Sequence, residues 1–523
     1  MYSKRWMIYM LGWAAALVLS SQSAAGITGL KATGHDSRID LVWNRDEQAV
    51  GYNIYSSHTR RMAWMRLNFK PHEPTVYSDF LGKNNQQYSY KVKSVLADGS
   101  ESAVFQTATA TSRAMKEEEL LTSVQQATLR YFWEYGHQVS GLARERKGSG
   151  DTCTSGGTGF GMMAIMVGVE RELIGRKEAA KRLLKMVCFL QEKASRYHGA
   201  WSHWLNGSTG KTIPFSRYDD GGDIVETAYL VEGMLTVRQY FGRDDSIEKE
   251  LRERITRLWH EVEWDWYLKT PESKQLYWHW SPKYGWKMNH KIGGHFNECM
   301  IVYLLAIASP SHPIEADCYY EGWCGEPPSE YVNGNSYYGY KQWVGWPKGG
   351  PLFFTHYSFL GFDPRGKRDK YCNYFENNRN ISLINRAYCM ENPDSHKGYS
   401  NLVWGLTASD TPGGYTAHEP RRDNGTITPS AALNAMPYVP EESIATLKHF
   451  YYELGEKLWG EFGFRDAFNL DKNWFAESYL AIDQGPIVCM IENYRTGLCW
   501  KMFMSNPEIP IMLNKIGWKS DNK

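Results

Sequence analysis

The segment Gly221-Gly222-Asp223-Ile224-Val225-Glu226-Thr227-Ala228 places a glycine pair directly before an apolar run that extends to Val237. Glycine permits a tight turn at the entry of a helix, and the run is long enough to form one. Comparable turns recur along the chain, at Gly156-Gly157, Gly293-Gly294, Gly349-Gly350 and Gly413-Gly414, with Gly485-Pro486 in a sixth place. Their spacing of about 56 to 72 residues leaves room for two helices in each repeat. The repeat predicts a mainly α fold, an (α/α)6 toroid of six inner helices ringed by six outer ones.

The fourth and fifth repeats are weaker than the others. Residues 310–425 are rich in Gly, Pro, Tyr and Asn, which predicts long loops. Long loops on one face of a rigid ring are a usual place for a substrate cleft. We therefore expect the cleft on the face that these loops cover.

Residues 27–112 differ from the rest of the chain. Short β-rich runs such as Ile39–Trp43 and Tyr88–Val92 alternate with turn residues. Their length and spacing, with Trp43 facing inward, resemble a fibronectin type III sandwich. We expect this small β-sandwich to act as a spacer or brace, followed by a catalytic toroid over residues 113–523.

The first 25 residues have the pattern of a secretory signal peptide. Lys4 and Arg5 precede an apolar stretch from Trp6 to Leu19, and Ser23-Ala24-Ala25 supplies small residues for cleavage. The stretch is too short to predict a membrane span. We expect residues 1–25 to be removed and the mature protein to be periplasmic or secreted, without membrane insertion.

The composition narrows the class of partner. Lys and Arg number 59 against 58 Asp and Glu, so no basic surface for nucleic acid or an anionic membrane is predicted. The aromatic content is 14%, with 21 Trp, and flat rings with a polar tip suit the faces of sugars. We expect a monomer whose partner is a neutral oligo- or polysaccharide.

Motifs for other chemistries are absent from the sequence. It contains no Gly-x-Ser-x-Gly elbow, no Walker loop and no His-Glu-x-x-His pair, and its Cys and His residues do not have the spacing of a structural zinc site. We therefore expect neither a cofactor nor a metal ion.

Nine cysteines are an odd number for an exported protein. Cys318 and Cys324 flank a loop and are the best candidates for a disulfide. The alternative, small buried hydrophobic residues, fits the cysteines that lie in apolar runs, which are Cys188, Cys299, Cys489 and Cys499.

Three carboxylates interrupt apolar runs beside glycine turns: Glu226, Glu298 and Asp483. An ionised carboxylate costs several kcal/mol to bury without partners, so such groups are paired, neutralised or functional. A pair of acids is what hydrolysis of a glycosidic bond requires. The three residues are our catalytic candidates.

Asp219, Asp223 and Glu226 stand at i, i+4 and i+7, and they share one face if a helix begins by Asp219. Asp219 or Asp220 could instead cap that helix. Glu226 lies a turn further in and cannot cap, which favours a role in the site. We expect Asp219 and Asp223 to bind substrate.

Glu298 is the only Asp, Glu, Lys or Arg between Gly293 and Ser309. Such surroundings disfavour the ionised form, as a general acid at neutral pH requires. The alternative is a buried structural Glu satisfied by a neighbouring His or by backbone. Asp483, at a turn beside Gln484, is expected to be more hydrated, which suits a base that activates water.

Further side chains are candidates for sugar contact. Trp278 and Trp286 belong to a cluster of rings dense enough to form a platform, although any one of them could be core. Three more substrate-binding candidates come from the loop-rich segment, namely Tyr357, Trp404 and His418.

Over about residues 115–515 the chain resembles the glucoamylase-like family of exported (α/α)6 proteins, closest to the endo-β-1,2-glucanases of glycoside hydrolase family 144. The matching motifs, in order, are Gly156–Gly161, Asp219–Ala228, Thr407–Asp410 with Gly413-Gly414-Tyr415, Thr428-Pro429 with Met436-Pro437-Tyr438, and Ala481–Pro486. The resemblance implies hydrolysis of β-1,2-glucan with inversion, Glu298 acting as the acid and Asp483 as the base. It implies a binding or supporting role for Asp219, Asp223 and Glu226, and leaves the division of roles between Glu226 and Glu298 open.

Other functions remain compatible with these residues. A non-catalytic glycan-binding protein could use the same cleft, and an exo-acting glucosidase or glucoamylase-like enzyme could use the same acids. A polysaccharide lyase needs a Tyr or His base and cationic neutralisation of a uronate, and the carboxylate-rich segment from Asp219 to Glu226 argues against it.

Overall fold

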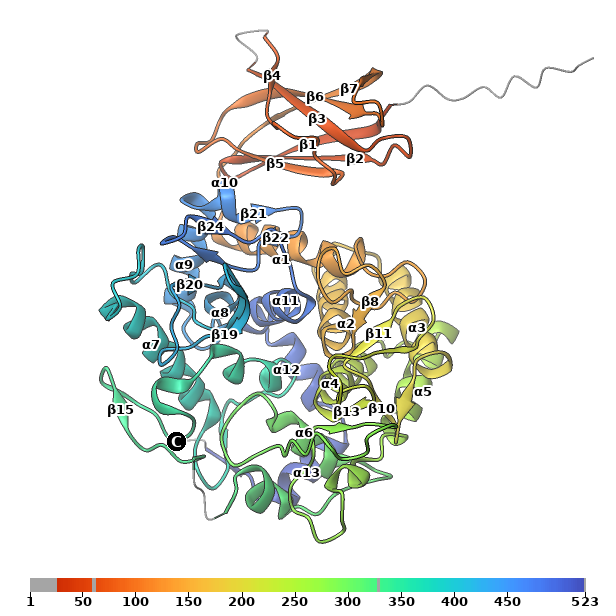
Figure 1. Ribbon diagram of the computed structural model, residues 1–523, viewed down its shortest axis with the longest axis vertical. Coiled ribbons are helices and arrows are strands. Elements are labelled where there is room, and N and C mark those ends of the chain that lie inside the picture. Colours follow the sequence, from red (N-terminus) through yellow and green to blue (C-terminus); the bar gives the residue numbers. More distant parts are fainter. Residues whose placement is uncertain (1–25, 59–62, 327–329, 522–523) are drawn as a thin grey trace, which may run out of the picture. The chain divides into compact units, whose positions relative to one another are not determined.

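The computed structural model describes residues 26–58, 63–326 and 330–521, and the chain divides after Arg113 into two compact units (Figure 1). The expected signal peptide, residues 1–25, lies outside the described residues. Each unit has its own secondary structure, β in the first and mainly helical in the second.

The first unit consists of two antiparallel sheets with strand orders β1-β2-β5 and β4-β3-β6-β7. The strands are β1 (Thr28–His35), β2 (Arg38–Asn44), β3 (Gly51–His58), β4 (Met65–Arg66), β5 (Val76–Phe80), β6 (Gln87–Val95) and β7 (Glu101–Thr111). Trp43 and Leu41 of one sheet share a buried cluster with Ile54 and Val92 of the other. The inner faces of the two sheets therefore form one core, as in a β-sandwich.

The second unit begins with five long helices. They are α1 (Glu117–Trp133), α2 (Ser155–Glu170), α3 (Arg176–Glu192), α4 (Ile224–Tyr240) and α5 (Ser246–His260). Helices α3 and α5 bury one stripe each, whereas α4 is buried on all sides from Ile224 to Arg238. A helix with an apolar stripe covers a core, and one buried all round lies inside it, so α4 is an inner helix and α3 and α5 are outer helices.

Helices α2 and α4 approach each other closely at two glycines. A Cβ on Gly159 would lie 2.2 Å from the carbonyl oxygen of Tyr229, and one on Gly233 would lie 2.1 Å from the carbonyl oxygen of Gly159. Any other residue would push the two inner helices apart. Because Tyr229 and Glu226 lie on the same helix, this contact also sets the position of the candidate acid.

The remaining helices complete a ring, and α11 packs against α1 (Figure 1). They are α6 (Met300–Ala308), α7 (Tyr374–Glu391), α8 (Pro429–Asn434), α9 (Pro440–Tyr452), α10 (Gly455–Leu458), α11 (Ala481–Arg495), α12 (Leu498–Met504) and α13 (Glu508–Ile516). The short turns are η1 (Trp264–Leu268), η2 (Cys318–Trp323), η3 (Pro347–Gly349), η4 (Leu352–Thr355) and η5 (Tyr357–Phe359). Among the described residues, no helix is both long and apolar enough to cross a membrane.

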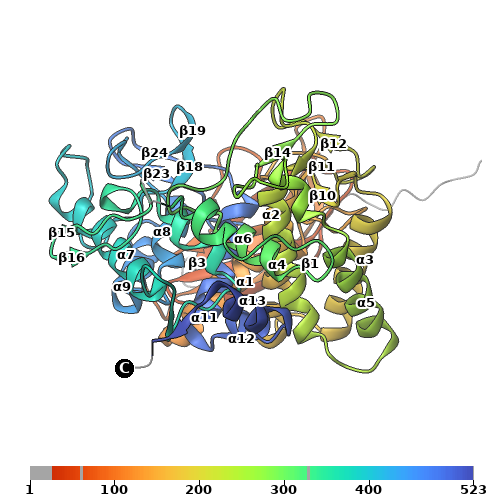
Figure 2. The same cartoon turned by 90° about the horizontal axis from the view of Figure 1, so that it is seen from below.

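Short strands connect the helices, and Figure 2 shows many of them along one edge of this unit, with α12 and α13 on the opposite side. The strands near the later site are β8 (Thr152–Thr154), β11 (Trp204–Asn206), β12 (Thr212–Ile213), β13 (Gly222–Asp223), β14 (His279–Trp280), β18 (Ala408–Thr411), β19 (Gly414–Ala417), β20 (Thr426–Ile427), β23 (Phe468–Asn469) and β24 (Trp474–Phe475). The others are β9 (Arg196–Tyr197), β10 (Ala200–Trp201), β15 (Ser336–Tyr337), β16 (Tyr340–Lys341), β17 (Lys367–Arg368), β21 (Trp459–Gly460), β22 (Gly463–Phe464) and β25 (Lys519–Ser520).

The prediction that each glycine pair precedes an inner helix is wrong for the fourth and fifth repeats. Gly349-Gly350 opens onto the short turns η4 and η5, where an inner helix was expected. Gly413-Gly414 lies in the β18–β19 hairpin, and the helix of that repeat begins at Pro429 instead. Proline is well suited to the first helical position because an N–H at that position would have no partner within the helix. The helix of this repeat therefore begins at the proline and not at the glycine pair.

Two local predictions also need correction. Helix α4 begins at Ile224, not by Asp219, because Asp223 caps it by accepting hydrogen bonds from the backbone N–H groups of Val225 and Glu226. Cys318 and Cys324 are both buried free thiols. They stand at the two ends of η2, which holds them in place without a disulfide.

Candidate active site

A cavity of about 420 Å³ lies within the second unit. Its wall contains two of the three candidate acids, Glu226 and Glu298, together with Arg146. Aromatic side chains make up much of the rest, namely Trp204, Phe215, Tyr229, Trp278, Phe353, Tyr357 and Tyr415. Ligand pockets commonly measure about 300–1,000 Å³ and combine apolar walls with a few polar groups, and this cavity has that character.

Glu298 lies two residues before α6, and its backbone holds it against the wall. Its carbonyl oxygen accepts hydrogen bonds from the hydroxyls of Tyr229, at 3.3 Å, and Ser358. Carboxyl oxygen Oε2 is buried and has no hydrogen-bond partner among the described residues. Burial raises the pKa of Glu298 to about 7, in the direction that its apolar sequence predicts. A carboxyl group of this kind is protonated near neutral pH and can donate its proton.

The carboxylate of Glu226 is held by hydrogen bonds, whereas Oε2 of Glu298 has none among the described residues. Oε2 of Glu226 accepts hydrogen bonds from the backbone N–H of Gly156, at 2.8 Å, and from the hydroxyl of Thr154, at 3.1 Å. Its Oε1 lies 3.9 Å from Nε2 of His203. Burial raises the pKa of Glu226, while the charge on His203 lowers it. The fixed carboxylate of Glu226 is therefore better placed to hold a substrate hydroxyl than to deliver a proton.

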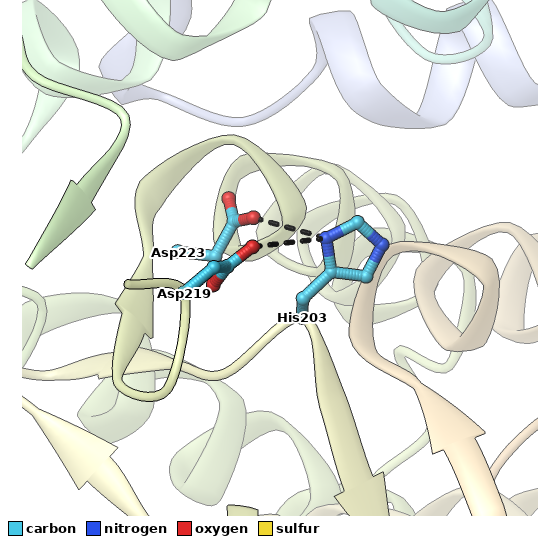
Figure 3. A group of neighbouring side chains, drawn as sticks. All are labelled: His203, Asp219 and Asp223. Carbon is cyan, nitrogen blue, oxygen red and sulfur yellow. Dashed lines mark ion pairs between the residues drawn. The ribbon is translucent and has the colours of Figure 1, made fainter. Parts of the chain in front are cut away.

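A cluster of two histidines and two aspartates lies beside Glu226, and Figure 3 shows three of its members, His203, Asp219 and Asp223. Pairing of β13 with β14 sets Asp223 opposite His279, and Oδ2 of Asp223 lies 3.2 Å from Nδ1 of His203 and 3.5 Å from Nε2 of His279. Oδ2 of Asp219 lies 3.2 Å from Nε2 of His279 and 3.9 Å from Nδ1 of His203. The cluster therefore connects the cap of α4 to two neighbouring loops.

Both histidines of this cluster are cationic near neutral pH. Burial lowers the pKa of His203, but Glu226, Asp223 and Asp219 outweigh this and raise it to about 9. Burial likewise opposes the two aspartates at His279, which raise its pKa to about 9. The ligand atoms of His203, Asp219 and Asp223 lie within 4.8 Å of one another and could hold a metal ion. Two imidazolium groups already supply the positive charge, so ion pairing accounts for this cluster.

Asp483, in the first turn of α11, forms a pair with Asp466. The two buried carboxyl groups interact closely enough that each affects the pKa of the other, and Oδ2 of Asp466 accepts the backbone N–H of Asp410 at 2.7 Å. Oδ1 of Asp483 accepts the hydroxyl of Ser430 at 3.2 Å. Burial raises the pKa of Asp483 to about 7, and burial together with the neighbouring charge of Asp483 raises that of Asp466 well above its ordinary value.

The expectation that Asp483 is well hydrated is wrong. Its residue surface is 2% exposed, because α11 is an inner helix and its first turn is covered by the segment that carries Ser430. Asp483 is not itself a wall residue, but Leu480 and Ile482, which precede it in the chain, line the wall. Burial raises the pKa of Tyr357, a wall residue, and the charges of both Asp483 and Glu298 add to that shift.

The aromatic candidates divide into two groups. Trp278 and Tyr357 line the cavity, and the indole N–H of Trp278 lies 3.2 Å from Oδ2 of Asp223. Trp286 is outside the wall and packs instead on Trp266 and Tyr277, with ring centroids 6.5 and 5.6 Å away.

The prediction that Trp404 and His418 contact the sugar is also wrong, because both are fully buried and neither lines the cavity. The indole N–H of Trp404 donates to the hydroxyl of Thr446 at 2.7 Å, and Nδ1 of His418 lies 3.3 Å from the carbonyl oxygen of Thr416. Sequence reasoning placed these two residues in loops, but the loops fold back and bury them as core.

Several site residues were missed from the sequence. Asp466 lies in the aromatic-rich segment Trp459–Phe468 next to Arg465, and Glu461 is in the same segment, so the isolation that marks Glu298 does not mark Asp466. His203 follows Trp201-Ser202 without a charged neighbour, and its ring stacks on Phe215 with centroids 4.2 Å apart. Only the fold shows that His203 and Phe215 form a cavity wall together with Trp204.

Comparison with known proteins identifies a family and a relative that this chain resembles. Residues 289–507 match the family described as "Putative glucoamylase". The chain is 44% identical over 515 residues to an exo β-1,2-glucooligosaccharide sophorohydrolase (non-reducing end) of Parabacteroides distasonis, a match that covers 93% of this chain and 70% of that protein.

Solved structures extend the similarity. A β-1,2-glucanase from Parabacteroides distasonis matches with a TM-score of 0.89 and 44% identity, over 95% of this chain and 74% of that one. An endo-β-1,2-glucanase from Chitinophaga pinensis, solved with sophorotriose and glucose, matches with a TM-score of 0.75 and 47% identity, over 78% of this chain and 99% of that one. These neighbours share the helical toroid of the second unit.

Proposed function

This chain belongs to the glucoamylase-like family of glycoside hydrolases, close to the endo-β-1,2-glucanases of glycoside hydrolase family 144, and from that premise we propose that it hydrolyses β-1,2-linked glucan or its oligosaccharides. The single observation that carries the proposal is Glu298, a carboxyl group in the cavity wall whose pKa burial raises to about 7. A protonated carboxyl group at neutral pH is the acid that cleavage of a glycosidic bond requires.

In the proposed mechanism, Glu298 protonates the glycosidic oxygen as the bond to the anomeric carbon breaks. The Asp466–Asp483 pair takes the proton of the attacking water, and Asp483 accepts it because Asp466 already holds a proton. The water attacks from the opposite side of the sugar, so the product has inverted configuration. Inverting enzymes hold their two carboxyl groups about 6.5–9.5 Å apart, and further if the proton passes through a hydroxyl.

The remaining polar groups of the site hold the substrate in this proposal. The carboxylate of Glu226 lines the cavity and is fixed by the backbone N–H of Gly156, so it is a preorganised acceptor for sugar hydroxyls. Asp223 is fully buried and supports the site by capping α4 and pairing with the cationic His203. Trp204, Phe215 and Trp278 offer ring faces to the CH-rich faces of glucose.

The position of the cut distinguishes two candidate modes. The sequence motifs predict endo action, and the 47% identity with the Chitinophaga pinensis endo-β-1,2-glucanase supports it. The match to the exo sophorohydrolase covers 93% of this chain, including the β unit, whereas the endo enzyme covers 78%. We propose exo release of sophorose as the main mode, because the exo sophorohydrolase is the relative whose match extends over both units of this chain.

A time course on linear β-1,2-glucan tests both the activity and the mode. We expect sophorose as the early product, with inverted anomeric configuration by NMR, and no release from α-1,4-glucan. An early ladder of longer oligosaccharides would establish endo action instead. No reducing sugar from any β-glucan would leave a glycan-binding protein and overturn the proposed hydrolase.

Export and the identity of the β unit are further proposals. The basic, apolar and small-residue pattern of residues 1–25 supports secretion, which N-terminal sequencing of the mature protein from culture fractions would test. The two antiparallel sheets around Trp43 support a fibronectin type III-like sandwich, and the helix pairs support an (α/α)6 ring.

A further inference from the structure

A second cluster of candidate metal ligands lies in the helical unit, and none of its residues lines the cavity. Asp394 and His396 follow the end of α7, and Asp423 stands shortly before β20. One ligand atom from each of these three residues lies within 4.8 Å of the other two. Since the residues come from two separate segments, an ion held here would join them.

The imidazole of His396 is held in one orientation. Its Nδ1 lies 2.8 Å from Oδ2 of Asp471, and the side chain of Asn392 bonds both its backbone N–H and its carbonyl oxygen at 2.8 Å. When Nδ1 donates to Asp471, Nε2 is the ring nitrogen that points to the other carboxylates of the cluster and that a metal ion would use. Metal-binding histidines commonly make this second bond to a carboxylate, which fixes the tautomer.

The other face of His396 meets a buried carboxylate. The side chain of Asp423 is 1% exposed, and its Oδ2 lies 3.6 Å from Nε2 of His396. Oδ1 of Asp423 accepts the hydroxyl of Tyr399 at 2.8 Å and the backbone N–H of Gly425 at 3.0 Å, but Oδ2 has no hydrogen-bond partner within the described ranges. A buried carboxylate oxygen beside Nε2 requires a positive charge there. Unlike the His203 cluster, this one has a single imidazole against three carboxylates, Asp394, Asp423 and Asp471, so a dication balances its charge better than one proton does.

Two neighbours, Tyr388 and Gly425, pack against the cluster. The hydroxyl of Tyr388 donates to Oδ2 of Asp394 at 3.4 Å. A Cβ on Gly425 would lie 2.7 Å from Oδ2 of Asp471 and 2.8 Å from Nδ1 of His396. Glycine at this place, with a φ of 77°, lets the two segments close around the cluster.

We propose that Asp394, His396 and Asp423 bind a divalent transition metal ion, with Zn²⁺ as the best fit. Zn²⁺ takes imidazole and carboxylate ligands at about 2.0–2.2 Å in a tetrahedron, whose edges are then about 3.4 Å long, close to the 3.6 Å between Nε2 and Oδ2. Ca²⁺ prefers about six to eight oxygen ligands, so an imidazole disfavours it. Water would complete the coordination, and the ion would join the segment after α7 to the segment before β20.

The test uses the untagged full-length chain, stripped with a chelator and then titrated with Zn²⁺ in a calorimeter. We expect one equivalent to bind in the micromolar range or tighter and to raise the melting temperature. His396→Gln and Asp423→Asn should each lose that equivalent, and Asp471→Asn should bind about 10–100-fold more weakly because it only orients the imidazole. Co²⁺ should give the absorption of a tetrahedral site with nitrogen and oxygen ligands.

His312→Gln is the matched control, because Nδ1 of His312 lies 3.4 Å from Asp265 in a more exposed pair. It should retain the full equivalent. If the wild-type chain binds no Zn²⁺, the proposal is wrong. If His396→Gln retains the equivalent, the ion sits at another group such as the His203 cluster, and the proposal is equally wrong. Should a variant fold poorly, an octahedral rather than tetrahedral Co²⁺ spectrum of the wild-type chain would overturn the assignment.

Discussion

Asp466 and Asp483 form a buried pair next to the cavity wall, in which each carboxyl group shifts the pKa of the other. Asp466 is bonded to the backbone N–H of Asp410, and Asp483 to the hydroxyl of Ser430. The proton acceptor of the proposed reaction is therefore a coupled pair rather than one hydrated aspartate. Its properties differ from those of Glu298, which has no partner for Oε2 in the described part of the chain.

Replacing Glu298 with Gln removes the proposed proton donor while keeping the size of the side chain. We expect a folded protein that is at least about 100-fold slower on β-1,2-glucan, the usual effect of losing a positioned acid. Glu315→Gln, at an exposed position, is the matched control and should have normal kcat. Near-normal turnover by the Glu298 variant would exclude this residue from the mechanism.

The two members of the aspartate pair should respond differently. Asp483→Asn should lose at least about 100-fold in kcat/KM, because the proton acceptor is gone. Asp466→Asn keeps a neutral hydrogen-bond donor beside Asp483, so we expect a loss of no more than about tenfold, the scale of one hydrogen bond. Equal losses in the two variants would contradict the assignment of Asp483 as the sole acceptor.

The pH profile of kcat/KM should be bell-shaped with its maximum near pH 7. Above a pKa of about 7, Glu298 ionises and can no longer donate, and below about 7 Asp483 becomes protonated and can no longer accept. The alkaline limb should therefore disappear in the residual activity of Glu298→Gln while the acidic limb remains. An unchanged alkaline limb in that variant would show that another group titrates there.

Glu232, in the middle of α4, should make the protein less stable as the pH rises. Burial raises its pKa to about 8, although the backbone N–H groups of Gly361 and Phe362 oppose this. The folded chain keeps the proton over a range in which the unfolded chain releases it, from about pH 4.5 to 8. The stability that this group contributes is therefore fully present below about pH 4.5 and declines through this range, by at most on the order of 5 kcal/mol.

Glu232→Gln keeps the oxygen that accepts these two bonds and removes the titration. Chemical denaturation at several pH values should show a shallower decline for this variant than for the wild-type chain. Glu253→Gln, at an exposed position on α5, should leave the decline unchanged. Parallel curves for the wild-type chain and Glu232→Gln would show that Glu232 does not carry the effect.

The helical unit should keep its activity without the β unit. Every residue of the cavity wall comes from Glu145 or later, and the unit has its own core. Residues 114–523 expressed alone should therefore cleave β-1,2-glucan with the kcat/KM of the full chain. A soluble, folded fragment without activity would show that residues of the β unit contribute to catalysis.

Much of the fold was predictable from local patterns. Ile224–Val237 is mostly apolar, with Glu226 and Glu232 as its charged residues, which predicted the inner helix α4, and the alternating runs of residues 27–112 predicted strands. The repeat failed where another local signal was stronger, as at Pro429, or where a glycine pair formed a hairpin, as at Gly413-Gly414. These errors arose because a glycine pair permits several kinds of turn and does not select one.

The sequence by itself determined that the second unit is mainly helical and that Glu298 is a carboxyl group in apolar surroundings, because helical periodicity and the cost of burying a charge are local properties. Only the tertiary structure decided which acids meet. Asp466 joins Asp483, and His203 joins Asp219 and Asp223, from separate loops and helix ends. It also removed Trp404 and His418 from the site, since nothing in the local sequence tells a buried loop from one that lines a cavity. Contacts between distant segments depend on how the whole chain packs, and the interactions of a side chain depend on those contacts.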